Sequence, residues 1–480
     1  MIRALLNWDE KASKNTFALL SVFGAVTFLF WFFYWICPPD VRLFTDDADS
    51  YIHYGPTRTI GYPVVLSLVK LLTGGYGAIP SVQLTALCAS VFAAAVALSR
   101  FFKSFALGVI LILTILSLSE IVKFCFEIYT ESLGVSLLLL LAATCLFYIK
   151  NPSKWPLFLI GLLVGLLILL RPSSYALLGS VFVLFLFYTP KIIDVFKLFI
   201  PPLVICLLIG AGVNYGHHGF FSTQSFMGHN LFGKMAFVVK DATQSTDLIE
   251  AEIIQKMAAG MAPLQGELDQ ITSLKLYYIL STPLYDKLRF FLLEKKFKPD
   301  IPELSEHRDL DGFYKNVALR IIAQNPVSYL KDVMIHYGAM WFIWDLITPG
   351  EKELLVSWID HLKDTDAFKQ IEQDYSWYKF REKGEVTIFL IRAFLYFCFC
   401  LSFIFIGRGL WCFVKRKQLS EIWGMGLFLS ASIHLTYFST ALFQAGYPRY
   451  SMFMWPYLFM MFLAFMGIGF DSFRKEKISD

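Results

Sequence analysis

The chain contains 480 residues, of which 42 are Lys or Arg and 38 are Asp or Glu, so that only 17% are charged, against about 25% in soluble domains. Its hydrophobic fraction is 56% and its mean hydropathy is +0.57. So few charges could not cover a soluble core of this size. The composition excludes disordered chains, secreted disulfide scaffolds and nucleic-acid-binding proteins, and it predicts an all-α protein that crosses a lipid bilayer several times.

About ten segments are predicted to span the bilayer, because each approaches the roughly 20 apolar residues that a spanning helix needs. They lie near 17–36, 80–99, 105–119, 132–149, 155–170, 174–189, 198–213, 386–407, 421–440 and 450–470. The first is too long for a signal peptide, and its exit, Cys37-Pro38-Pro39-Asp40, is unlike a small-residue cleavage site. We therefore expect it to stay in the protein as an anchor.

The distribution of basic residues predicts the orientation of these spans. Lys and Arg gather in alternate connections, starting with the N-terminal segment and ending with the C-terminal one. Because cytoplasmic loops carry an excess of basic residues, this alternation predicts an even number of spans and places both termini in the cytoplasm.

Two regions then face outward, the loop at 38–80 and the long segment at 214–384. The long segment has 19 basic and 23 acidic residues, a net charge of −4 against +8 for the rest of the chain. It is too long for a plain connection, so we expect a largely helical module between membrane blocks at 1–213 and 385–480. At 327–347 an otherwise apolar and aromatic stretch contains Lys331, Asp332, His336 and Asp345, which favours an interfacial helix over an eleventh span.

Three aspartates, Asp46, Asp47 and Asp49, stand together in the first outward loop, where we also expect short interfacial helices. Repulsion between such close carboxylates favours a proton on one of them, a property that suits a general base. The alternative is a solvated loop in which one Asp caps the following helix.

Other charged residues lie where spans meet the outward face. Glu131 opens a span, which the helix dipole alone would favour, and Arg171 ends one, where it would also serve as a snorkelling anchor. Arg449 and Tyr450 lie in the last outward loop. A guanidinium among aromatic rings suits a lipid phosphate, although interfacial aromatic belts need no functional explanation.

Metal and nucleotide sites have little support in the sequence. His217, His218 and His229 lack Asp, Glu or Cys at ligand spacing, so we expect no metal site. The chain has no P-loop, no dinucleotide-binding fingerprint and no G-x-S-x-G motif. We therefore expect no cofactor and no nucleic-acid partner.

A series of short motifs runs in order along most of the chain. They are Asp47-Ala-Asp-Ser-Tyr51, Arg58-x-x-Gly61-Tyr62-Pro63, Tyr129-Thr-Glu131-Ser-Leu, Leu170-Arg171-Pro172, Asn214 through Gly219-Phe220, Gly228-His-Asn230-Leu231, Asn325-Pro326-x-x-Tyr329-Leu330 and Gly446-Tyr-Pro-Arg449-Tyr450. Together they resemble the integral-membrane C-type glycosyltransferases that use polyprenyl-phosphate sugars. The likeness is to bacterial members grouped with protein O-mannosyltransferases and lipid A aminoarabinose transferases.

The resemblance implies an inverting transferase in a bacterial inner membrane, with its active site on the periplasmic face. Its donor would be a polyprenyl-phosphate sugar, and its acceptor a hydroxyl on a lipid, a polysaccharide or a protein. The family places the catalytic base four residues before a Tyr, which carries over to Asp47 and Tyr51. Asp46 and Asp49 stay open as the base, because three aspartates replace the family's Asp-Glu pair.

The leaving phosphate in such a reaction calls for a guanidinium opposite the base. By resemblance, Arg449 is expected to meet the phosphate, Arg58 to order the catalytic loop, and Arg171 to belong to the same outward face. Glu131 is expected to position the acceptor or to steady an arginine. Tyr51, Tyr54 and Tyr62 are expected to line the sugar pocket.

Three other functions fit parts of the pattern. A polymerase or ligase of lipid-linked polysaccharide would also span the membrane many times, but it depends on Arg-rich outer loops, whereas the long outward segment here is acidic overall. A flippase or transporter would be expected to show paired, broken spans in two repeats. A non-catalytic scaffold would tolerate neutralisation of all three aspartates.

Overall fold

A computed structural model describes residues 15–45, 47–189, 191–235, 238–239, 307–342, 346–347, 385–443 and 448–479, together with 353, 381–382 and short pieces between 250 and 278. At 307–310, 346–347, 381–382, 448–449 and 470–479 only the backbone is described.

The described part of the chain is almost entirely helical, which confirms the predicted all-α class. Its other regular element is a two-residue parallel pair, β1 (Leu346–Ile347) with β2 (Arg381–Glu382). In chain order the helices are α2 (Thr16–Ile36), α3 (Ala48–Ile52), α4 (Gly61–Thr73), α5 (Ile79–Phe102), α6 (Phe105–Ser117), α7 (Ser119–Lys123), η1 (Phe124–Phe126), α8 (Glu131–Lys150), α9 (Lys154–Leu170), η2 (Pro172–Ala176), α10 (Leu177–Tyr188), α11 (Ile192–Asp194), η3 (Val195–Phe199), α12 (Ile200–His218), α13 (Met227–Met235), α16 (His307–Gln324), α17 (Pro326–Phe342), α20 (Glu385–Val414), α21 (Glu421–Phe443), α22 (Pro448–Phe453) and α23 (Trp455–Ser479).

Six helices in the described residues are long and apolar enough to cross a membrane, so the protein is a multi-pass membrane protein. A seventh span results if α6 and the helix that follows it, which are bent by 60° at Leu118, count as one. The predicted segments at 155–170, 174–189 and 450–470 also form apolar helices, but their apolar stretches, which end at Gly469 in the last one, have only 10–17 residues. The structure therefore supports six or seven spans and leaves the predicted ten unconfirmed.

The chain divides into two compact units. Residues 1–224, 400–436 and 452–480 make up the first unit, and residues 225–399 and 437–451 make up the second. These units are defined by contacts and not by exposure to water, so the predicted division at 213 and 384 stays a prediction. The interfacial helix predicted at 327–347 corresponds to α17 of the second unit, which ends at Phe342.

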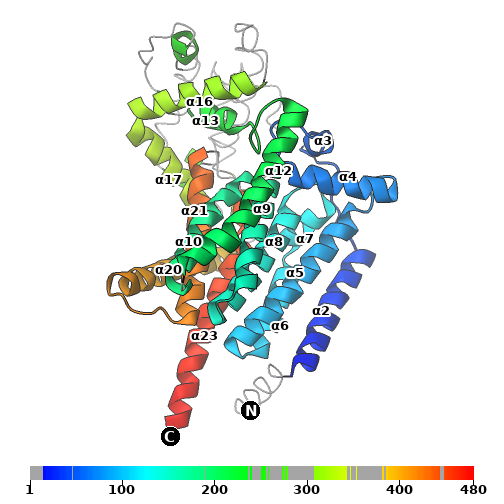
Figure 1. Cartoon of the computed structure of the whole chain (residues 1–480), viewed down its shortest axis with the longest axis vertical. Helices are drawn as coiled ribbons and strands as arrows, with labels where there is room; N and C mark the ends of the chain where they lie inside the picture. Colours follow the sequence, from blue (N-terminus) through cyan, green and yellow to red (C-terminus); the bar gives the residue numbers. More distant parts are fainter. Residues whose placement is uncertain are drawn as a thin grey trace. The chain divides into compact units, whose positions relative to one another are not determined.

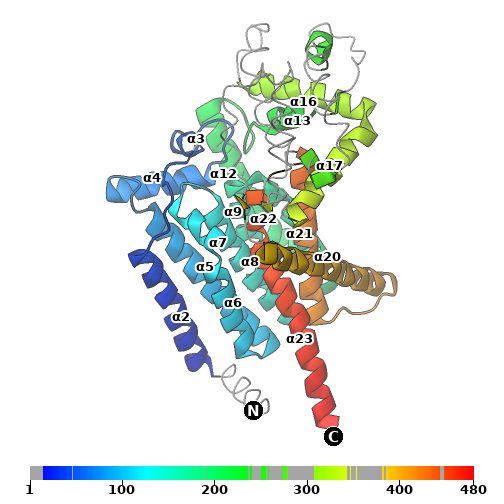
Figure 2. The same cartoon turned by 180° about the vertical axis from the view of Figure 1, so that it is seen from behind.

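In the first unit, α5 packs against α2, α6 and α8, while α9 packs against α8 and α12 (Figures 1 and 2). Small residues let these helices approach closely, as is usual where lipid removes the hydrophobic drive for association. A Cβ on Gly165 would lie 2.7 Å from the Cβ of Cys206. The resulting bundle supports the loops at its ends.

Helix α4 lies across the end of this bundle at a steep angle to α5, and α3 lies at the same end (Figures 1 and 2). Its buried face includes Tyr62, Leu66 and Val69, whereas Leu71 and Leu72 are exposed. The helix ends at Gly74, whose φ of 78° gives a left-handed C-cap that a side chain would strain. This amphipathic helix is the platform for the loop that precedes it, which contains Asp47 and Arg58.

Candidate active site

Asp47 directly precedes α3, but its side chain does not cap that helix. Its carboxylate instead meets Arg58, with Asp47 Oδ1 2.5 Å from Arg58 Nη2. The two side chains are 28% and 21% exposed, so the pair is partly screened from water and still open on one side. This geometry does not support the capping interpretation at Asp47.

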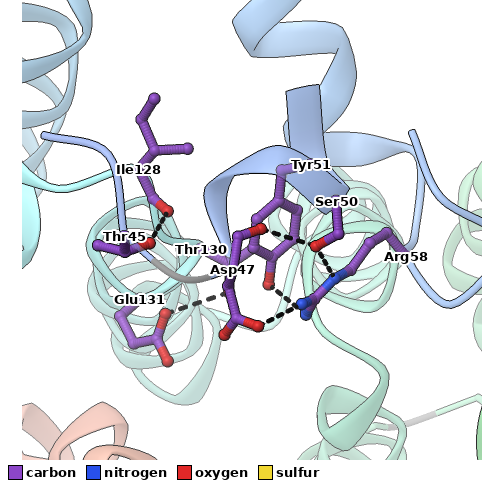
Figure 3. Close-up of polar contacts among 8 residues, drawn as sticks. All are labelled: Thr45, Asp47, Ser50, Tyr51, Arg58, Ile128, Thr130 and Glu131. Atoms are coloured by element: carbon purple, nitrogen blue, oxygen red, sulfur yellow. Dashed lines mark hydrogen bonds and ion pairs between the residues drawn. The ribbon is translucent and has the colours of Figure 1, made fainter. Parts of the chain in front are cut away.

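Arg58 uses each part of its guanidinium to hold the loop (Figure 3). Its Nε donates to Ser50 Oγ at 2.8 Å, and its Nη1 donates to the hydroxyl of Tyr51 at 3.0 Å. The guanidinium carbon lies 4.2 Å from the centre of the Tyr51 ring. Ser50 in turn donates to the backbone carbonyl of Asp47 at 2.7 Å. These bonds connect Asp47 to the α3 turn through a planar group that fits several acceptors at once.

Ser50 is a residue that the sequence analysis missed. Its hydroxyl joins the backbone of Asp47 to the side chain of Arg58. A Ser three residues after an Asp, at the start of a short helix, is a common side-chain-to-backbone bonding pattern. That spacing was the available signal.

The other aspartates of the triplet differ from Asp47. Asp49 has a side chain that is 86% exposed and pairs with His53, with Asp49 Oδ1 2.9 Å from His53 Nδ1. It therefore lies on the water-facing side of α3. Asp46 lies outside the described residues. Among the described aspartates of the loop, Asp47 is the one held by an arginine.

Glu131 and Arg171 form a buried ion pair below this loop. Glu131 Oε1 lies 3.3 Å from Arg171 Nη1, and the two side chains are only 4% and 7% exposed. Thr130 donates to the other carboxylate oxygen of Glu131 at 3.3 Å. The guanidinium carbon of Arg171 lies 4.5 Å from the centre of the Phe453 ring. Arg171 is thus not a snorkelling anchor, because its head is buried with a counter-charge.

The ion pair and the aspartate loop share one apolar cluster. Ala48, Tyr51, Tyr62 and Leu170 all belong to it, and the rings of Tyr51 and Tyr62 meet edge to face at 5.3 Å. Figure 3 shows the carboxylates of Asp47 and Glu131 extending to the same side of the loop. The structure therefore brings together Asp47, Arg58, Tyr51, Tyr62, Glu131 and Arg171.

A close approach of two backbones keeps α4 in place beside this cluster. A Cβ on Gly61 would lie 2.6 Å from the carbonyl oxygen of Leu169, which cannot move as a side-chain end could. We expect Gly61→Ala to lower the stability of the first unit by about 1–3 kcal/mol, the usual cost of overpacking. Thermal unfolding in detergent measures this. Gly77→Ala is the control, because a Cβ there meets nothing within 4 Å; equal melting temperatures for the two variants would contradict the prediction.

Tyr54 connects the loop to the end of α12. It has a φ of 49°, a left-handed conformation that tertiary contacts must hold. Its hydroxyl donates to Asn214 Oδ1, and its ring centre lies 5.5 and 5.0 Å from those of His217 and His218. Burial raises the pKa of Tyr54 to about 12, so the hydroxyl keeps its proton as a donor. The two histidines thus pack against Tyr54, and within the described residues no cluster of three metal-ligating side chains occurs.

Glu127 lies in the segment that leads to Glu131. Burial first, and then the charges of Glu131 and Glu120 against that of Lys123, raise the pKa of Glu127 to about 7. An ordinary glutamate has a value of 4.5, so the folded protein holds this proton more tightly than the unfolded chain does. The resulting stability is full below pH 4.5 and is lost as the pH rises to about 7.

Glu127→Gln is accordingly expected to flatten the pH dependence of stability. Wild type should lose melting temperature between pH 4.5 and pH 7 relative to the variant, because only wild type gives up this proton. Thermal unfolding of both proteins across that range measures the difference. Parallel curves for wild type and Glu127→Gln would contradict the assignment.

Two expected substrate-binding residues belong to the second unit. Tyr450 is partly buried in α22, and the side chain of Arg449 lies outside the described residues. The pairing of Arg449 with a donor phosphate stays a prediction.

The second unit contains its own buried charges, which the sequence analysis did not connect. Lys234 Nζ lies 3.0 Å from Asp332 Oδ2, with side chains 1% and 5% exposed, and it also donates to the carbonyl of Ala441. Burial opposes ionisation of Asp332, but Lys234 and His336 beside it lower its pKa to about 2. Lys234 thereby ties α13 and α17 to the end of α21. Separation by about a hundred residues hid this cluster from local patterns.

His229 and Asp311 form another contact in the second unit, with His229 Nδ1 2.9 Å from Asp311 Oδ1. Gly228 lets α13 approach α16, since a Cβ there would overlap the backbone of Asp311. This pairing gives His229 a carboxylate partner within the second unit.

Comparison of the chain with protein-family models, with curated proteins and with solved structures finds no match. Any function assigned to the site therefore rests on its residues and their geometry.

Proposed function

We propose that the protein is an inverting membrane glycosyltransferase that moves a sugar from a polyprenyl-phosphate donor to an acceptor hydroxyl, with Asp47 as general base. The observation that best supports this is the Asp47 carboxylate, which is partly shielded from water and held by an arginine that is itself hydrogen-bonded to Ser50 and Tyr51. A loop aspartate without a function would not need so many constraints on its position.

In the proposed reaction the acceptor oxygen attacks the anomeric carbon from the side opposite the phosphate. The bond between the anomeric carbon and the phosphate oxygen breaks, and its electron pair stays on that oxygen as polyprenyl phosphate leaves. Asp47 takes the proton of the acceptor hydroxyl. A base must come within about 2.6–3.2 Å of that hydroxyl. Because Arg58 fixes one carboxylate oxygen of Asp47, the direction from which the acceptor approaches is set in advance.

The cations of the site are proposed to stabilise the leaving phosphate. Arg171 is buried against Phe453 and carries a carboxylate partner, so its charge acts in a medium of low dielectric constant. Glu131 steadies Arg171 in this proposal, and Arg449 is assigned to the same phosphate from the last outward loop. Tyr51, Tyr54 and Tyr62 supply the aromatic surroundings of the sugar.

The membrane arrangement is part of the proposal. Ten spans result if the bent pair and three of the four shorter apolar helices, all except α4, cross the bilayer together with the six long ones. Both termini then lie in the cytoplasm of a bacterial cell, and the Asp47 loop lies on the periplasmic face of the inner membrane. The donor's lipid tail would lie between spans, which explains why this chemistry uses so much membrane.

The test uses purified full-length protein in nanodiscs with a panel of radiolabelled polyprenyl-phosphate sugars and a membrane extract as acceptor. Label should pass from at least one lipid donor into the acceptor fraction, while the corresponding sugar nucleotides should give none. No transfer from any donor by folded protein would contradict the proposal. Label in long chains would indicate a polymerase, and label moved across the bilayer with the donor intact would indicate a transporter.

A further inference from the structure

Gln83 is a fully buried polar residue near the outward end of α5 that the proposed chemistry does not use. A neutral amide inside a spanning helix is costly unless both its donors and its acceptor have partners. All of the partners of Gln83 come from the two segments that form the candidate site.

The amide of Gln83 has one acceptor and two donor hydrogens, and each is used. Oε1 accepts from the hydroxyl of Tyr62 at 3.2 Å. Nε2 donates to the carbonyls of Cys125 and Glu127 at 3.0 and 2.9 Å, with that of Phe124 at 3.4 Å. Carbonyl oxygens can only accept, so this orientation of the amide is the one that satisfies the whole group.

On one side, Gln83 supports the aromatic contacts beneath Asp47. Burial raises the pKa of Tyr62, so its hydroxyl stays a donor to Gln83. The Tyr62 ring meets the Tyr51 ring, and the Tyr51 hydroxyl accepts from Arg58. The position of Arg58, and with it the Oδ1 of Asp47, therefore depends on where Tyr62 is held.

On the other side, Gln83 supports the segment that approaches Asp47 from the second loop. The last carbonyl that it binds, that of Glu127, directly precedes Ile128, whose N–H donates to the carbonyl of Leu43 at 2.9 Å. The Ile128 carbonyl accepts from Thr45 at 3.3 Å. This segment then runs on into α8, whose first residue is Glu131. The same amide thus holds both the chain leading into Asp47 and the chain leading into Glu131.

We propose that Gln83 is a positioning residue that joins the two outward loops and sets the placement of Asp47 relative to Glu131. Its effect on the structure stands by itself, and only its effect on catalysis rests on the proposed transferase function. A glutamine is required here because the site presents a hydroxyl on one side and backbone carbonyls on the other.

Two substitutions of nearly equal length separate shape from hydrogen bonding. Gln83→Met keeps the length and removes every hydrogen bond. Gln83→Glu keeps the acceptor for Tyr62 but replaces the donor Nε2 with a carboxylate oxygen that faces the carbonyls of Cys125 and Glu127. Gln418→Met is the matched control, since Gln418 is exposed in the connection between α20 and α21.

The structural test is hydrogen–deuterium exchange of the full protein in nanodiscs. Both Gln83 variants should speed exchange of the Ile128 amide about tenfold or more, as expected from the loss of two ordinary hydrogen bonds. Exchange should also rise at residues 43–54, and it should stay unchanged within the centre of α8. Unchanged exchange at 43–54 and 124–131 would overturn the proposal, whether or not the protein proves to be a transferase.

The catalytic test measures kcat and KM on the folded fraction of each variant. Misplacement of Asp47 should lower kcat at least about tenfold, since small displacements of a base cost much of its effect. A role limited to folding would instead lower the yield of folded protein and leave its kcat equal to that of Gln418→Met, and this result would overturn the positioning role. If wild type transfers no sugar, the transferase proposal fails while the exchange experiment still decides the coupling of the loops.

Discussion

Asp47→Asn is expected to lower sugar transfer by about 10²–10⁴-fold, the usual contribution of a general base, without unfolding the protein. Asparagine retains the shape and a carbonyl oxygen that can still accept from Arg58 Nη2, so the bonds of Arg58 to Ser50 and Tyr51 should persist. What it loses is the ability to take a proton. Initial rates at saturating donor, together with thermal unfolding of both proteins, measure the two parts of this prediction.

Variants at neighbouring aspartates decide which carboxylate is the base. Asp49→Asn should retain most of the activity, because Asp49 points to water and pairs with His53. Asp40→Asn is the surface control, since Asp40 is exposed outside the triplet. Loss of transfer in Asp46→Asn or Asp49→Asn, with Asp47→Asn active, would move the base to that residue. Full activity in all three triplet variants would contradict an aspartate base altogether.

Arg171→Met is expected to destabilise the first unit by about 3–5 kcal/mol, the cost of breaking a buried ion pair by removing one partner. The reason is that Glu131, whose side chain is only 4% exposed, would be left ionised without its cation. Methionine is long enough to keep contact with the Phe453 ring, so the change chiefly removes charge. Thermal or denaturant unfolding in detergent measures the loss.

The double variant Arg171→Met with Glu131→Gln tests the cause. Neutralising both partners removes the uncompensated charge, so the double variant should recover a large part of the stability that the single variant loses. It should stay inactive, because the proposed phosphate-binding cation is gone. Arg42→Met, at an exposed arginine of the first loop, is the control. Equal stability of the single and double variants would show that the pair contributes through packing instead of charge.

Helix positions were largely predictable from the sequence, but the number of spans was not. The apolar run at 155–170 is a helix, α9, as expected, yet its 17 residues lie at the short end of the range of about 17–25 residues that a spanning helix needs. The run at 105–119 forms a helix whose continuation turns by 60°. Hydropathy reports how apolar a segment is, whereas tilting, bending and pairing of helices depend on neighbours.

The sequence by itself determined that this is a helical membrane protein and that charged residues collect in the loop after the first apolar helix and at the starts and ends of other apolar helices. It did not determine how those charges pair. A glutamate that begins a helix and an arginine that ends another each have a sufficient local explanation. The sequence therefore offered no reason to predict that Glu131 and Arg171 pair with each other. The pair forms because α8 and α9 pack side by side and bury both side chains together.

The same reason explains why tertiary structure alone separated the aspartates. Asp47 and Asp49 are only two residues apart in the sequence. Because α3 packs Ala48 and Tyr51 into the apolar cluster, Asp49 points to water and Asp47 lies beside Arg58. Burial and charge pairing are properties of surfaces brought together by folding. The sequence specifies which charged groups are present. Only packing decides which of them meet in a buried environment, where the low dielectric constant makes their interaction strong.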